Sequence, residues 1–101
     1  MASRRVTKSP ESRKDLEAIW SYIAKDSPTA ASSMLRRINH NIDSLRHAPY
    51  RGEAQPQFGE NIRRIIVDNY LVFYRVEEKV QILRIYHAAR KWEDLFRAEL
   101  E

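Results

Sequence analysis

Residues 62–87 read IRRIIVDNYLVFYRVEEKVQILRIYH, and this stretch decides the fold. Two short polar breaks, Asp68-Asn69 and Glu77-Glu78-Lys79, divide it into three runs rich in β-branched and aromatic residues. Runs of this length separated by tight polar turns are typical of an antiparallel three-stranded meander. Neither glycine nor proline interrupts the runs, so the middle one qualifies as a central strand.

The register of the predicted meander determines which side chains share a face. Two-residue hairpins at Asp68-Asn69 and Glu78-Lys79 would place Arg64 opposite Phe73, and Phe73 opposite Arg84. An apolar face then collects Ile65, Val67, Tyr70, Val72, Tyr74, Val76, Leu83 and Ile85. The opposite, mixed face collects Ile62, Arg64, Ile66, Leu71, Phe73, Arg75, Ile82, Arg84 and Tyr86. A slip of one residue in either hairpin would exchange the faces, so this assignment depends on the turns.

Two helix starts precede the meander. Ser9-Pro10 and Ser27-Pro28 each combine a serine N-cap with proline at the first helical position. We expect the two helices to end near Asp26 and near His47, before Pro49. Their apolar stripes comprise Leu16, Ile19, Trp20 and Ile23, and then Ala31, Met34 or Leu35, Ile38, Ile42 and Leu45. The pair forms an αα-hairpin that should cover the apolar face of the sheet.

The remaining segments complete a single α+β domain over residues 1–101. Residues 4–8 give a weak strand signal, and residues 48–61 form a connecting loop with both glycines. Trp92, Leu95, Phe96 and Leu100 have helical spacing, which predicts a short C-terminal helix. The mixed face of the sheet is then open, or covered by a partner or by this helix.

Composition narrows the classes of function. The chain has no cysteine, which excludes disulfides, thiolate metal sites and cysteine nucleophiles. We find no apolar run of membrane-spanning length and no signal-peptide pattern, so a cytoplasmic location is expected. The net charge is +4, and arginine outnumbers lysine by 13 to 5. Arginine suits bidentate contacts to carboxylates and phosphates, so its excess suggests either a binding surface or background usage.

The chemistry that the sequence offers is limited. It contains no glycine-rich phosphate loop and no spacing of metal ligands, so no cofactor and no metal are expected. The one suggestive constellation comprises Arg64, Arg75, Arg84, Tyr86 and His87 on the meander, with Arg51 before it and Arg90 after it. Such a set could bind a phosphate backbone and a stacked base, cleave RNA with a general base, or bind acidic side chains. Alternatively, Arg64 and Arg84 sandwich Phe73 as structural cation–π contacts.

Several segments resemble the RelE/ParE toxin superfamily of bacterial type II toxin–antitoxin systems. Ser9-Pro10-Glu11 through Ile19-Trp20-Ser21-Tyr22-Ile23 is similar to the first helix of the ParE branch, and Pro49-Tyr50-Arg51-Gly52 to its following turn. Ile62-Arg63-Arg64 with Tyr70-Leu71-Val72-Phe73-Tyr74-Arg75-Val76 resembles the strand signature. The final strand through Ala88-Ala89-Arg90 resembles the ending, so the similarity covers nearly the whole chain.

The resemblance implies a cytoplasmic toxin with a RelE/ParE-like fold that a ParD-like antitoxin neutralises with an acidic wrapping segment. In the ParE branch the toxin is a non-enzymatic inhibitor that poisons DNA gyrase, and DNA is contacted only indirectly, through the antitoxin complex. The alternative is a RelE-like, ribosome-dependent mRNA endoribonuclease that uses Arg64, Arg84, Tyr86 and His87. We favour the ParE branch, because this sheet has no lysine outside a turn and the chain continues for fourteen residues past His87.

Candidate contact residues follow from the same resemblance. Those for the target are Arg51, Arg64, Arg75, Arg84, Arg90 and Trp92. Those for the antitoxin are Trp20, Ile23, Met34, Leu71, Phe73 and Arg84.

Overall fold

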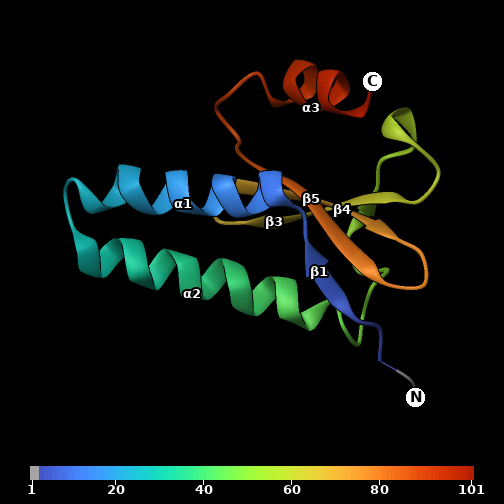
Figure 1. Cartoon of the computed structure of the whole chain (residues 1–101), viewed down its shortest axis with the longest axis horizontal. Helices are drawn as coiled ribbons and strands as arrows, with labels where there is room; N and C mark the ends of the chain where they lie inside the picture. Colours follow the sequence, from blue (N-terminus) through green and yellow to red (C-terminus); the bar gives the residue numbers. More distant parts are fainter. Residues whose placement is uncertain (1–2) are drawn as a thin grey trace.

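The structure, a computed structural model that describes residues 3–101, is a five-stranded sheet with helices on both faces (Figure 1). The first two residues of the predicted domain lie outside the described residues. In chain order the elements are β1 (Val6–Lys8), α1 (Pro10–Ala24), α2 (Pro28–Ser44), β2 (Glu53–Ala54), the 3₁₀ helix η1 (Pro56–Phe58), β3 (Ile62–Val67), β4 (Tyr70–Val76), β5 (Val80–His87) and α3 (Trp92–Leu100). The predicted α+β class is confirmed.

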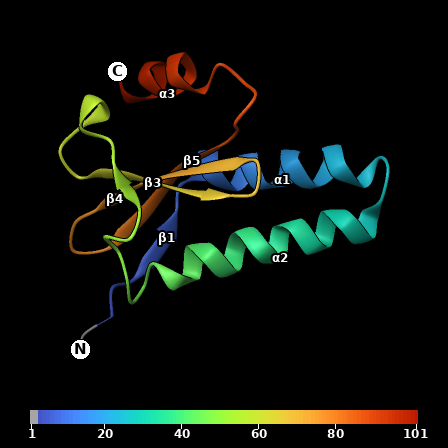
Figure 2. The same cartoon turned by 180° about the vertical axis from the view of Figure 1, so that it is seen from behind.

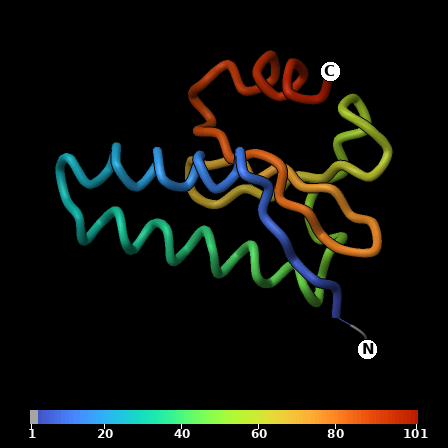
Figure 3. Tube along the Cα trace, viewed as in Figure 1, coloured from blue at the N-terminus to red at the C-terminus, as the bar shows by residue number. Residues whose placement is uncertain are grey.

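The helices occupy distinct places around the sheet. α1 and α2 run side by side as an antiparallel pair whose connecting turn projects beyond the sheet (Figures 1 and 2). The Cα trace shows that the chain returns over the sheet after β5, so that α3 lies across it from α2 (Figure 3). Over residues 3–101, none of these helices combines the length and the apolar character that a membrane span requires.

Both predicted helix starts are present. The Ser9 hydroxyl accepts a hydrogen bond from the Ser12 backbone N–H at 3.0 Å, and the Ser27 hydroxyl accepts one from Ala30 at 3.1 Å. Each bond satisfies one of the backbone donors that a helix N-terminus leaves free. α2 ends at Ser44, three residues earlier than predicted, because the chain turns there before Pro49.

The meander has the predicted pairing in its first hairpin. β3 pairs antiparallel with β4, with Arg64 opposite Phe73 and Ile66 opposite Leu71. The sheet order is β1-β5-β4-β3-β2, and β1 pairs parallel with β5. The weak strand expected at residues 4–8 is therefore real, and it makes the sheet mixed.

The second hairpin differs from the prediction in its turn. Glu77–Lys79 form a three-residue connection that places Val76 opposite Val80, whereas the sequence suggested a two-residue turn. The predicted pair of Phe73 with Arg84 is nevertheless observed. The three-residue turn shifts the pairing register by one residue, and an irregularity along β5 shifts it back before Phe73.

The second irregularity is a β-bulge at Leu83. Tyr74 pairs with Ile82 and Phe73 pairs with Arg84, so Leu83 is the extra residue of β5. Ile82 consequently lies in the core beneath α1 and α2, and Leu83 packs on the opposite face. The sequence-based assignment of these two residues to faces was wrong, because strict alternation ends at a bulge.

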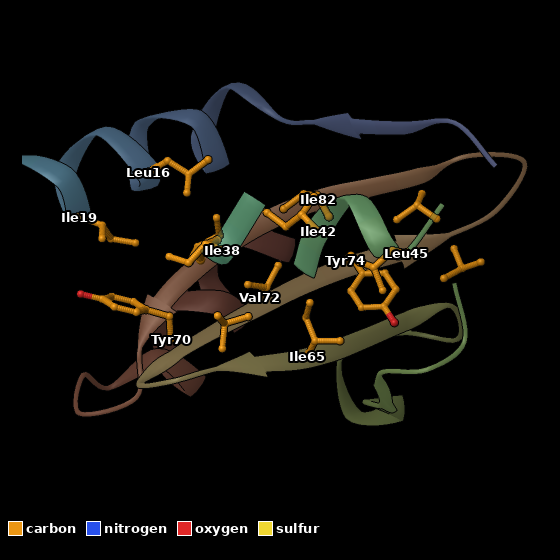
Figure 4. Packing of buried hydrophobic residues seen from close by; sticks show 14 residues of the cluster. Leu16, Ile19, Ile38, Ile42, Leu45, Ile65, Tyr70, Val72, Tyr74 and Ile82 are labelled. Carbon is orange, nitrogen blue, oxygen red and sulfur yellow. The ribbon is translucent and has the colours of Figure 1, made fainter. Parts of the chain in front are cut away.

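The main core fills the space between the α1–α2 pair and the sheet (Figure 4). Figure 4 shows Leu16 and Ile19 of α1 and Ile38 and Ile42 of α2 packed among side chains of the strands. The sheet contributes Ile65, Val67, Tyr70, Val72, Tyr74, Val76, Val80, Ile82 and Ile85. Apart from the bulge, this is the predicted apolar face.

A second apolar cluster lies on the other face of the sheet, beneath α3. Phe96 of α3 is fully buried, and its ring centroid lies 4.4 Å from that of Phe73 and 4.9 Å from that of Phe58. Leu71 and Tyr86 of the sheet belong to the same cluster. Of the three possibilities for the mixed face, the C-terminal helix is the one that the structure shows.

Gly52 provides a direct test of packing in the loop before β2. Its N–H donates to the buried Tyr74 hydroxyl at 3.0 Å, and that hydroxyl donates to the Pro49 carbonyl at 2.8 Å. A Cβ at position 52 would lie 2.4 Å from the Tyr74 hydroxyl and 2.9 Å from the Arg64 carbonyl oxygen. We therefore expect Gly52→Ala to lower the free energy of unfolding by about 2 kcal/mol in urea denaturation.

The double variant Gly52→Ala/Tyr74→Phe provides the control. Without the hydroxyl the added methyl group has more space, so the double variant should be less destabilised than the sum of the two single variants. Strictly additive effects would show that the clash at the Tyr74 hydroxyl does not determine the cost.

Candidate functional site

Arg84 ties three elements together. Its Nε and Nη2 donate to the two carboxylate oxygens of Asp15 in α1 at 2.8 and 3.0 Å, and its Nη1 donates to Glu99 of α3 at 2.5 Å. Asp15 also accepts the Ile85 backbone N–H at 2.8 Å. The bond to Asp15 raises the pKa of Arg84 above its ordinary value, so the guanidinium stays charged. These contacts hold α1, β5 and α3 in place, and they use three of the five N–H donors of the guanidinium.

Arg64 is also engaged within the molecule. Its Nη2 donates to Glu53 at 2.9 Å, and its guanidinium carbon lies 5.6 Å from the centroid of the Trp92 ring. The Arg84 guanidinium lies 4.9 Å from the Tyr86 ring. The two arginines therefore lie against Trp92 and Tyr86, whereas one of the alternatives drawn from the sequence had them sandwich Phe73.

Tyr86 is buried beneath α3. Its side chain is 1% exposed, and its hydroxyl has no hydrogen-bond partner among residues 3–101. Burial raises the pKa of Tyr86 to about 12. A phenol in this position does not reach a ligand while α3 covers it.

The raised pKa of Tyr86 predicts a loss of stability in alkaline solution. The unfolded phenol loses its proton near pH 10 and the folded one near pH 12, so this contribution is complete below pH 10 and is lost as the pH rises to 12. Tyr86→Phe should therefore have a flatter decline of urea midpoint between pH 9 and 11.5 than the parent. Tyr22→Phe, at a 70% exposed position, should decline as the parent does. Parallel curves for Tyr86→Phe and the parent would contradict the assignment.

His87 lies on the other face of the sheet. It pairs with Tyr70, and the two rings meet edge to face with centroids 5.2 Å apart. Its Nδ1 accepts the Ala89 backbone N–H at 3.0 Å, so in the neutral ring Nε2 carries the proton. The imidazole is partly exposed at a groove of about 500 Å³, lined by Asp15, Ala18, Ile19, Tyr22, Tyr70, Ile85, His87, Ala89 and Arg90.

The four residues proposed for RNA cleavage are therefore not assembled. Arg64, Arg84 and Tyr86 lie on the face covered by α3, whereas His87 lies on the α1 side. Within residues 3–101, no three histidine, aspartate or glutamate side chains gather in an arrangement that could hold a metal ion.

The other residues proposed for target contact are dispersed. Arg51 is exposed in the loop between α2 and β2, and Arg90 is exposed at the groove. Arg75 is partly exposed on β4, and Trp92, the first residue of α3, packs half-buried against the second cluster. These four positions do not form one continuous site.

The residues proposed for antitoxin contact divide into two groups. Trp20 is 40% exposed on α1, and its indole N–H lies 3.4 Å from the Ser32 hydroxyl of α2. Ile23 and Met34 pack partly buried at the edge of the main core. Leu71 and Phe73 are 5% and 0% exposed, and α3 covers them together with Arg84. Their contact with an antitoxin stays a prediction, and in this structure α3 lies over all three.

Sequence reasoning also missed exposed features. Tyr22 and Ile66 are 70% and 61% exposed, and the sequence pattern assigned a contact role to neither. Tyr50 is 57% exposed and carries the guanidinium groups of Arg4 and Arg63 against its ring. No pattern in the sequence indicates this stack, because its members are far apart along the chain.

Comparison with known proteins identifies the family. The sequence model of the ParE toxin of the type II toxin–antitoxin system parDE matches residues 6–92. Y4kP of Sinorhizobium fredii is 30% identical over 94 residues, which cover 91% of this chain and 96% of that protein. Toxin RelE2 of Caulobacter vibrioides is 39% identical over 77 residues, which cover 75% and 85%. The chain belongs to the ParE toxin family of type II toxin–antitoxin systems.

The fold agrees with this membership. The solved structure of the chromosomal ParDE toxin–antitoxin system from P. aeruginosa superposes with a TM-score of 0.72. The match covers 84% of this chain and 96% of that chain at 21% identity. The predicted RelE/ParE-like architecture is therefore confirmed.

Proposed function

We propose that this toxin stops bacterial growth by binding and poisoning DNA gyrase in the cytoplasm, without chemistry of its own. The observation that carries the proposal is the separation of Tyr86 and His87 by the sheet, together with the engagement of Arg84 by two carboxylates. General acid–base catalysis needs groups within hydrogen-bond reach of the same reacting atoms. The membership of the ParE family supports the same conclusion.

The accessible cationic and aromatic side chains are our candidates for contact with gyrase. They are Arg51, Arg75, Arg90 and the exposed edge of Trp92. Arg64 and Arg84 are assigned a supporting role, because each is already bonded to a carboxylate.

A second candidate function is cleavage of mRNA on the ribosome. The observation that favours it is the 39% identity to toxin RelE2 of Caulobacter vibrioides. The four residues Arg64, Arg84, Tyr86 and His87 would then act after α3 moves away from the sheet. This would require the loss of the buried contacts of Phe96 and of the ion pair between Arg84 and Glu99.

The two functions are separated by assays on protein made by cell-free synthesis. We expect the toxin to inhibit supercoiling by purified gyrase and to trap cleaved DNA, while ribosome-bound mRNA stays intact. His87→Ala should leave the effect on gyrase unchanged. Codon-position cleavage of mRNA that His87→Ala abolishes, with gyrase unaffected, would overturn the proposal in favour of the ribonuclease.

We further propose that a ParD-like antitoxin neutralises the toxin by laying an acidic segment along the α1–α2 pair. Trp20, Ile23 and Met34 form the accessible apolar part of that surface. Exposed tryptophans commonly contribute a large share of binding energy at interfaces.

Trp20→Ala tests this surface. We expect it to weaken binding of the cognate antitoxin by about tenfold or more in calorimetry, with little change in toxicity. Leu95→Ala, which removes an exposed side chain of α3, is the control and should bind normally. Equal affinities for the two variants would exclude Trp20 from the interface.

A further inference from the structure

Two arginines from distant parts of the chain stack on the exposed ring of Tyr50. The guanidinium carbon of Arg4 lies 5.5 Å from the ring centroid, and that of Arg63 lies 5.1 Å from it. Arg63 donates to the carbonyls of Tyr50 and Gly52 at 3.1 and 2.7 Å. Arg4 donates to the Tyr50 hydroxyl and to the backbone carbonyl of Glu77. Both side chains are therefore held in fixed positions at the surface.

Arg51, the next residue along the chain, is held beside this stack. Its Nη2 donates to the Asn41 side-chain oxygen and to the Ser44 hydroxyl, both at 3.0 Å. These acceptors belong to the last turns of α2. We call the group of Arg4, Tyr50, Arg51 and Arg63 the Tyr50 corner.

The arginines of the Tyr50 corner differ from the other bonded arginines in their acceptors. Five arginines elsewhere pair with carboxylates, namely Arg37, Arg46, Arg64, Arg84 and Arg97. The three at the corner donate only to neutral oxygens of carbonyl, hydroxyl and amide groups, among the bonds found within residues 3–101. Neutral acceptors fix a guanidinium without cancelling its charge, so the corner keeps three positive charges in a rigid arrangement.

Glu77, the acidic residue that Arg4 contacts, does not cancel the positive charge of the Tyr50 corner. Glu77 offers Arg4 its backbone carbonyl, while its side chain lines a separate hollow with Arg5, Glu78 and Lys79. That hollow contains two acidic and two basic residues, so it adds no net charge.

The chemistry of the corner matches phosphates of a nucleic-acid duplex. Arginine binds phosphate oxygens bidentately, and phosphate contacts supply the sequence-independent part of duplex binding. Single strands are usually bound by aromatic rings on which bases stack. The Tyr50 ring already has two guanidinium groups against it, so it does not serve as such a platform.

We propose that the Tyr50 corner binds the phosphate backbone of a nucleic-acid duplex, so that the toxin itself contacts nucleic acid. This goes beyond the proposed function and holds whichever target the toxin has. It also replaces the expectation that DNA is contacted only through the antitoxin complex.

The test measures duplex binding by full-length toxin from cell-free synthesis. Fluorescence anisotropy of a labelled 24-base-pair DNA and of the matching RNA duplex is followed from about 50 to 200 mM salt. The triple variant Arg4→Gln/Arg51→Gln/Arg63→Gln should bind about tenfold or more weakly at the lowest salt. The slope of its log affinity against log salt should decrease in magnitude by about 2–3, because each lost phosphate contact lowers that slope by about 0.9.

The matched control removes the same charge from α1 and α2, in the triple variant Arg13→Gln/Lys14→Gln/Arg36→Gln, whose exposed side chains have no carboxylate partner among residues 3–101. This control should bind within about twofold of the parent and keep most of its salt slope. Arg4→Gln alone leaves the bonds of Arg51 and Arg63 in place, and it should reduce the slope by about 0.9 even if the triple variant folds poorly.

Loss of affinity confined to the corner variants supports the proposal. The duplex, DNA or RNA, that the parent toxin binds more tightly is the form that the corner prefers. Equal losses in the corner and control triples would overturn the proposal, since net charge alone would then explain the binding. Tighter binding of poly-glutamate than of either duplex, at equal charge concentration, would also overturn it, because the corner would then be a site for acidic protein.

Discussion

Replacing Phe96 by alanine should lower the free energy of unfolding by about 3–5 kcal/mol, because its ring fills the centre of the cluster beneath α3. The side chain is fully buried, and its centroid lies 4.4 Å from that of Phe73, 4.9 Å from Phe58 and 6.3 Å from Tyr86. Within residues 92–100 no other side chain is fully buried, although Trp92 and Leu100 pack partly buried on the same cluster and Glu99 pairs with Arg84. Urea denaturation at neutral pH measures the loss.

Leu95→Ala is the matched control for this prediction. It shortens an apolar side chain of the same helix that is 38% exposed, so its cost should be well below that of Phe96→Ala. Hydrogen exchange adds a second readout, because the amides of α3 should exchange faster in Phe96→Ala before the sheet does. Similar unfolding energies for the two variants would show that the second cluster contributes little to stability.

Asp15→Ala should have the second largest effect, with a loss of about 2–4 kcal/mol in the free energy of unfolding. The carboxylate is 14% exposed, and it accepts two bonds from Arg84 and one from the Ile85 N–H. Its removal leaves the N–H of Ile85 without its partner at the part of β5 that lies beyond β1. Thermal and urea unfolding measure the change.

Two further variants show which part of this contact matters. Asp15→Asn keeps one oxygen acceptor, so it should be destabilised less than Asp15→Ala. Asp43→Ala removes an exposed carboxylate that pairs with Arg46, and it should change stability little. If Asp15→Ala unfolds as readily as Asp43→Ala, the contact between α1 and β5 is not a major source of stability.

The elements that the sequence predicted well are those determined by neighbouring residues. Ser9 and Ser27 precede helices because each serine hydroxyl accepts a backbone N–H of the first turn and the following proline has the φ angle of a helix. Both effects are local in the chain. The turn at Asp68 pairs Val67 with Tyr70, and a non-glycine residue adopts φ 53° there. Aspartate tolerates this conformation better than most residues, so the first hairpin could be predicted from its residue types.

The elements that the sequence did not predict depend on distant contacts. The bulge at Leu83 breaks an alternation that residue types alone cannot place. Leu71 and Phe73 are covered because α3 docks through Phe96, and helical spacing does not say where a helix packs. The sequence also does not indicate which acceptor an arginine will bond to. Arg84 donates to a carboxylate, whereas Arg63 donates to a neutral carbonyl oxygen.

The parallel pairing of β1 with β5 has a consequence for the order in which the protein folds during synthesis. Val6 pairs with Val80, and the Ser9 N–H donates to the Ile82 carbonyl at 2.9 Å, so the first strand finds its partner only after β5 has been synthesised. The α1–α2 pair can form while the ribosome is still making the strands, since its contacts are local in the chain. The sheet is completed only after β5 leaves the exit tunnel. A nascent chain arrested before residue 80 therefore lacks the folded surface of the finished toxin.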